Sequence, residues 1–131
     1  MLKEKDYCDK DLSLALKEVG YIGQGRCYYD LDKEPNKLRH LDIQVLTTRS
    51  AEALNFVLAV HLYDAQKWLR EKHNLHIEII YSPSCWTCKI YDLKEWDYIK
   101  GFTFIESYEE ALSEGLRYAV KILKENETIH E

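Results

Sequence analysis

The chain of 131 residues has little proline and glycine, two and five residues respectively, and no apolar run longer than the five residues from Phe56 to Val60. A bilayer-spanning helix needs about 20 apolar residues, so we expect no association with a membrane. The segment from Met1 to Lys10 lacks the apolar core of a signal peptide, which predicts a cytoplasmic protein. The chain also lacks an excess of basic charge, because 18 Lys and Arg stand against 23 Asp and Glu. With a net charge of −5 it has no positive field for a polyanion, so we expect it to bind no nucleic acid.

Signatures of catalysis are missing as well. The sequence contains no Ser-His-Asp spacing, no glycine-rich phosphate loop, no HExxH motif and no paired-carboxylate signature. His61 falls on an apolar stripe, where a histidine of the core is expected more often than an active-site base. We therefore expect a protein that is not an enzyme, with no catalytic residue and no cofactor.

The residues that are present predict a packed core, since 46% are hydrophobic and 12% are aromatic. Asp11 can cap a first helix that Gly20 ends, and helical periodicity predicts two more helices. Alternation of apolar and polar residues predicts five strands. In chain order after the first helix, the expected elements are strands Arg26 to Leu31 and Leu41 to Leu46, helix Leu54 to His73, strands Leu75 to Tyr81, Trp86 to Leu93 and Phe102 to Ser107, and helix Tyr108 to Lys124.

This order, α-β-β-α-β-β-β-α, predicts a single α+β domain with helices packed on one side of an antiparallel sheet. Residues 1–46 would form an N-terminal helix and hairpin, residues 47–124 an α-β-β-β-α unit, and residues 125–131 a frayed tail. The α-β-β-β-α order is also that of a double-stranded-RNA-binding domain. Such domains carry basic residues where the last helix begins. Here that turn carries Glu106, Glu109 and Glu110, which would repel a phosphate backbone.

Two motifs resemble a known group of proteins. They are Ala65 to Ile79 (AQKWLREKHNLHIEI) and Ser107 to Leu112 (SYEEAL). Both are similar to segments of small proteins from phages and mobile elements of gut anaerobic bacteria, a group for which no activity is known. The resemblance implies a small accessory role in a bacterial or phage cytoplasm, and it supplies no functional residue.

The motif Cys85-Trp86-Thr87-Cys88 is the most chemical feature of the chain. A redox pair opens a helix, whereas these residues lie in a predicted strand, where positions three apart point to opposite faces. A zinc ribbon would need a second close pair, and Cys8 and Cys27 are too far apart in sequence to supply it. We expect four free thiols and no metal, with Cys85 the most reactive; any thiol or zinc site would use Cys85 and Cys88.

The three-strand unit predicts an interaction surface. If the helices cover one face of the sheet, Ile80, Tyr91 and Ile105 form an apolar stripe on the other, with Lys89 and Glu78 as charges at its rim. Tyr91 would be the aromatic anchor of that surface. We therefore expect an accessory or regulatory module that binds an unknown protein or a second copy of itself. The alternatives are a protein that sequesters a small ligand such as a nucleotide signal, and a thiol or zinc protein that uses the CWTC motif.

Overall fold

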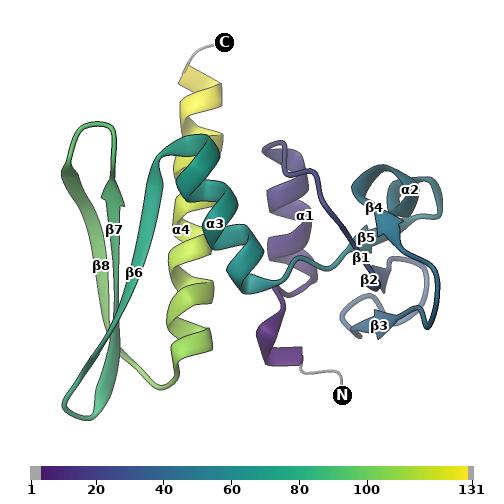
Figure 1. Ribbon diagram of the computed structural model, residues 1–131, viewed down its shortest axis with the longest axis horizontal. Coiled ribbons are helices and arrows are strands. Elements are labelled where there is room, and N and C mark those ends of the chain that lie inside the picture. Colours follow the sequence, from purple (N-terminus) through teal and green to yellow (C-terminus); the bar gives the residue numbers. More distant parts are fainter. Residues whose placement is uncertain (1–3, 130–131) are drawn as a thin grey trace. The chain divides into compact units, whose positions relative to one another are not determined.

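The computed structural model describes residues 4–129, and for Phe104 and residues 127–129 the backbone alone (Figure 1). The fold is of the α+β class with antiparallel sheets, as the sequence predicts. The chain divides into two units, residues 1–61 and 62–131. The second unit therefore begins at Leu62 rather than at residue 47.

The described part of the first unit, from Glu4 onward, has eight short elements. In order they are η1 (Glu4–Asp6), α1 (Lys10–Glu18), β1 (Gln24–Gly25), β2 (Cys27–Asp30), β3 (Arg39–His40), β4 (Leu46–Thr47), α2 (Thr48–Ala53) and β5 (Phe56–Leu58). Strand β2 lies between β3 and β5 in an antiparallel sheet, and β1 pairs with β4. Helix α1 is capped by Asp9, whose carboxylate accepts a hydrogen bond from Leu12 N at 2.8 Å, and not by Asp11 as predicted. Gly20, with φ of 103°, follows its end as expected.

Two predicted elements of this region are wrong. Of the predicted strand Leu41 to Leu46, only Leu46 lies in a strand, β4, and Ile43 is 84% exposed in an irregular segment. The predicted helix Leu54 to His73 begins only at Leu62, because Asn55 has a positive φ of 59° and residues 56–58 pair with β2 instead. An apolar run of five residues fits a buried strand as well as a helical stripe, so periodicity alone does not decide between them.

Buried hydrogen bonds hold the start of the first unit to its end. The carbonyl oxygen of Cys8 accepts hydrogen bonds from Tyr29 Oη at 2.7 Å and from Ser13 Oγ at 3.3 Å. Ser13 Oγ in turn accepts a bond from Val60 N at 3.3 Å. Burial, followed by the charge of Asp9, raises the pKa of Tyr29 well above its usual value, so its hydroxyl remains a donor.

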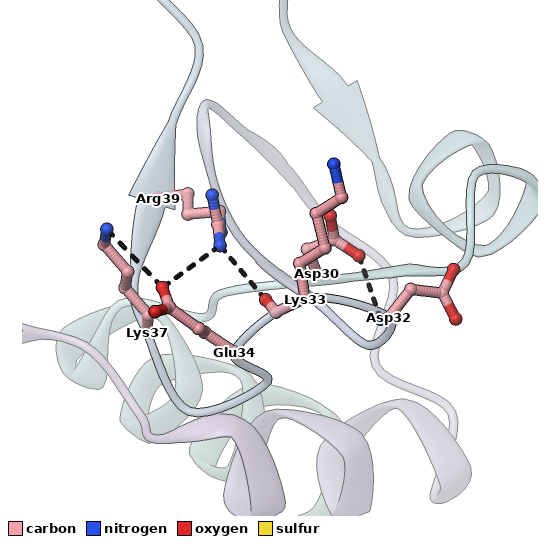
Figure 2. Close-up of polar contacts among 6 residues, drawn as sticks. All are labelled: Asp30, Asp32, Lys33, Glu34, Lys37 and Arg39. Atoms are coloured by element: carbon pink, nitrogen blue, oxygen red, sulfur yellow. Dashed lines mark hydrogen bonds and ion pairs between the residues drawn. The ribbon is translucent and has the colours of Figure 1, made fainter.

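The loop between β2 and β3 is braced by charged side chains (Figure 2). The Glu34 carboxylate lies 3.6 Å from Lys37 Nζ and 3.5 Å from Arg39 Nη2. Arg39 Nη2 also donates to Lys33 O at 3.1 Å, and Asp30 accepts a bond from Asp32 N at 2.9 Å. Glu34 lies in the turn of this loop with a positive φ of 46°.

The second unit has the predicted α-β-β-β-α order. It consists of α3 (Leu62–His73), β6 (Leu75–Ser82), β7 (Cys85–Asp92), β8 (Asp97–Ile105) and α4 (Tyr108–Ile129). The strands form an antiparallel sheet in the order β6-β7-β8, and both helices lie on the same side of it (Figure 1). Helix α4 is capped by Ser107, as predicted, and continues past Lys124 to Ile129, so the predicted tail is helical over its described part.

The core of the second unit lies between this sheet and the two helices. Leu69, Ile77, Ile90 and Leu116 are fully buried there. Trp68, next to Leu69 on α3, is half-buried and contacts His73 edge to face. Leu69 of α3 and Leu116 of α4 therefore lie on the faces of the two helices that pack inward.

Candidate functional site

The candidate site is the face of the β6-β7-β8 sheet that is turned away from α3 and α4. On β6, Leu75 and Ile77 are buried toward the helices, so the alternate residues Glu78 and Ile80 lie on the other face. Directly paired residues of neighbouring strands share a face. Glu78 is paired with Lys89, and His76 is paired with Tyr91. Four of the five predicted interaction residues therefore lie together: Glu78, Ile80, Lys89 and Tyr91.

The fifth residue, Ile105, lies on the opposite face, and its predicted placement is wrong. Trp86 pairs with Ile105 and Cys88 pairs with Phe102, so β8 contains one residue more than β7 between these pairs. Trp86 shares its face with the buried Cys88 and contacts the ring of Tyr108 in α4, with centroids 5.6 Å apart. The bulge therefore turns Ile105 toward the helices. Strict alternation of faces along the strand from Phe102 places Ile105 on the other face, because it takes no account of a bulge.

Tyr98, which lies outside the predicted strand Phe102 to Ser107, is also on this face. It pairs with Tyr91, and the two rings meet edge to face with centroids 5.8 Å apart. Tyr98 is 59% exposed, and its hydroxyl lies where a Cβ of Gly101 would be. A glycine inside a strand indicates such a close approach, and this signal could have extended the predicted strand back to Asp97. We call the surface formed by Glu78, Ile80, Lys89, Tyr91 and Tyr98 the tyrosine face.

Glu78 interacts electrostatically with the hydroxyl of Tyr91. Partial desolvation, followed by this interaction, raises the pKa of Tyr91, so the phenol is neutral at physiological pH. His76 of β6 pairs with Tyr91. Its Nδ1 is shielded from solvent and has no hydrogen-bond partner in the described structure. The face thus offers two rings, one carboxylate and one ammonium group.

The CWTC motif does not bring its two thiols together. Cys85 and Cys88 lie three residues apart on the regular strand β7, so their side chains are on opposite faces of the sheet. Cys88 is fully buried, and burial followed by the carboxylate of Glu114 raises its pKa to about 11. Cys85 is half-buried, with its Sγ 3.5 Å from Ser82 Oγ. Among the described residues, no group of three or more His, Cys, Asp or Glu side chains is placed to hold a metal ion.

His61, expected in the core, is half-buried and contacts the ring of Tyr7, with centroids 5.2 Å apart.

Within residues 4–129 no helix is both long and apolar enough to cross a membrane. Comparisons with protein-family models, curated proteins and solved structures give no match for the chain.

Proposed function

We propose that this chain is a small, non-enzymatic accessory or regulatory module of phage or mobile-element origin that binds a protein partner in the cytoplasm. The observation that carries the proposal is the pair of tyrosines on the tyrosine face, of which Tyr98 is exposed and Tyr91 half-buried. An antiparallel sheet that is covered on one side is normally polar on the other. Tyrosine is enriched at protein interfaces, where a buried aromatic anchor often contributes on the order of 2 kcal/mol.

The layout of the tyrosine face supports this function. Tyr91 packs edge to face against Tyr98 before any partner arrives, so less conformational entropy is lost when it is buried. Lys89 and Glu78 add one charge of each sign beside the rings. A partner that fits this face presents an apolar side chain to the tyrosine pair and polar groups to the two charges.

The experiment compares affinity capture by the native protein with capture by the double variant Tyr91→Ala, Tyr98→Ala. The matched control is Tyr63→Ala, which removes another exposed tyrosine from α3. A partner captured by the native protein and by the control, lost with the double variant and bound again as a purified protein in calorimetry supports the proposal. Equal capture by the folded double variant would place the binding surface elsewhere.

The two alternatives predicted from the sequence have less support. A nucleotide site needs several groups that hold phosphate, and the depression lined by Leu41, Asp42, Ile43 and Gln44 has one cation beside it, Arg26, whose Nη1 donates to Asp42 O at 3.4 Å. A thiol or zinc site would need Cys85 and Cys88 to converge, and they lie on opposite faces of β7. Protein binding through the tyrosine face therefore remains our proposal.

A further inference from the structure

The two edges of the second unit's sheet differ in regularity. Strand β6 forms one edge and pairs with β7 through eight consecutive residues without a register shift. Strand β8 forms the other edge and is interrupted by two register shifts. Bulges make an edge unsuitable for further pairing, whereas a regular edge is a template for another strand. The edge of β6 is therefore the one that can accept a strand.

The hydrogen-bond pattern shows which groups of β6 point away from β7. Asn74 and Leu93 are the opposed residues next to the Leu75–Asp92 pair, and Leu93 N donates to Asn74 O at 2.7 Å. Hydrogen-bonded and non-hydrogen-bonded pairs alternate along an antiparallel ladder, so the even-numbered residues of β6 bond to β7. The odd-numbered residues direct their N–H and C=O groups outward. Gln66 of α3 confirms this independently, because its Nε2 donates to the outward carbonyl of Ile77 at 2.7 Å.

The second half of β6 has no such cover. The outward N–H and C=O groups of Ile79 and Tyr81 have no hydrogen-bond partner in the part of the chain that the structure describes. Natural edge strands are usually protected by lysine, proline or a bulge. Strand β6 contains no Lys, Arg or Pro, and its one carboxylate is Glu78. The edge at Ile79 and Tyr81 therefore satisfies the requirements for strand addition.

We propose that a second copy of this chain occupies the edge, with β6 pairing antiparallel to its own counterpart about a two-fold axis at Ile80. In this register Ile79 lies opposite Tyr81 of the second copy, and Tyr81 lies opposite its Ile79. All eight outward groups of the two residue pairs are then used in four hydrogen bonds. The bond from Gln66 to Ile77 is kept. This pairing uses backbone groups of β6 and needs no groove or pocket.

Side chains also fit this register. The two Ile80 side chains meet on the tyrosine face at a non-hydrogen-bonded pair, and Glu78 lies opposite Ser82 of the second copy, so no like charges face each other. The neighbouring two-fold registers are worse. An axis at Ile79 needs the Ile77 carbonyl that Gln66 occupies, and an axis at Tyr81 places Pro83 in the ladder, where it has no N–H to donate.

The first experiment is a disulfide test of the register in the full chain, with Ile80→Cys and the matched control Glu78→Cys. At a non-hydrogen-bonded pair the two Cα atoms at position 80 are about 4.5 Å apart, within the range of a disulfide. The two positions 78 are displaced by four residues along the strands, about 13 Å, which is too far. Mild oxidation should link Ile80→Cys through position 80, as shown by peptide mapping, and leave Glu78→Cys unlinked. Equal cross-linking of both variants would overturn the register.

The second experiment is sedimentation at high micromolar concentration. The native protein should sediment as a dimer, and Ile80→Lys, which places two ammonium groups at the axis, should be a monomer. Thr87→Lys is the control, because Thr87 pairs with Ile80 on the same face but lies on the central strand β7. The Thr87→Lys variant should remain a dimer. A monomeric native protein would overturn the proposal. Loss of partner binding in the tyrosine double variant leaves the dimer intact, so the two proposals fail separately.

Discussion

Gly115 of α4 faces Cys88 of β7 so closely that a Cβ on the glycine would lie 2.6 Å from the Cys88 Sγ and 2.7 Å from Ile77 Cγ2. Both neighbours are fully buried, so neither has room to move. The absence of a side chain at residue 115 thus sets how near the last helix lies to the sheet.

Gly115→Ala should therefore destabilise the protein. Alanine gains about 1 kcal/mol of helix propensity, but overpacking a full core costs about 1–3 kcal/mol. We expect a net loss of about 1 kcal/mol in the free energy of unfolding, measured by urea denaturation. Lys121→Ala, an exposed position of the same helix, should change it little. A more stable Gly115→Ala variant would contradict the close packing.

Gly101→Ala should move Tyr98 without unfolding the sheet. The new methyl group takes the place of the Tyr98 hydroxyl, and that exposed ring can swing away at little cost. The nuclear Overhauser contacts between the Tyr91 and Tyr98 rings should weaken or disappear, and affinity for a partner should fall. Thr103→Ala on the same strand is the control. Unchanged ring contacts would show that Tyr98 does not lie over Gly101.

Asp9→Ala and Asp11→Ala distinguish the observed helix cap from the predicted one. Loss of the Asp9 carboxylate leaves Leu12 N without its acceptor and should cost about 1 kcal/mol of stability. Asp11 is exposed and lies 3.3 Å from Lys10, a surface ion pair whose loss should cost well under about 1 kcal/mol. Thermal or urea unfolding of the two variants gives the comparison. The reverse order of the two effects would assign the cap to Asp11.

The four thiols should react in a fixed order. Cys85 is half-buried and the other three are buried, so a thiol reagent at mildly alkaline pH should modify Cys85 first in the native protein. Cys88 should react only on unfolding, because burial raises its pKa to about 11. Mass spectrometry of partly labelled protein locates the label. Labelling of Cys88 before Cys85 would show that the sheet and α4 separate in solution.

Stability should fall at alkaline pH. The pKa of Cys88 is higher in the folded state than its ordinary value of 9.0, so its contribution to stability is present below pH 9 and is lost as the pH rises toward about 11. The raised pKa of Tyr29 acts in the same direction. The melting temperature should decline over this interval, and Cys88→Ala should decline less steeply. An equal slope in the variant would assign the loss to other groups.

The second unit could be predicted from sequence because its signals are local. The cap at Ser107, the periodicity of α4 and the alternation of β6 each depend on neighbouring residues. The positions of Ile105 and β5, in contrast, depend on pairing with other strands. A bulge opposite Trp86 turns Ile105 to the opposite face of the sheet. Residues 56–58 form β5 because they pair with β2. Tyr98 was missed for the same reason, since its place beside Tyr91 follows from the register between β7 and β8. Non-local pairing has no counterpart in a local pattern.

The hydrogen bond from Val60 N to Ser13 Oγ spans 47 residues of sequence. During synthesis this bond cannot form until almost all residues of the first unit have left the ribosome. Helix α1 therefore cannot complete its packing until β5 has been synthesised. The strands of the second unit, by contrast, meet their partners across short turns and can pair as they emerge. The two units should thus acquire structure on different schedules, the first in one late step and the second progressively.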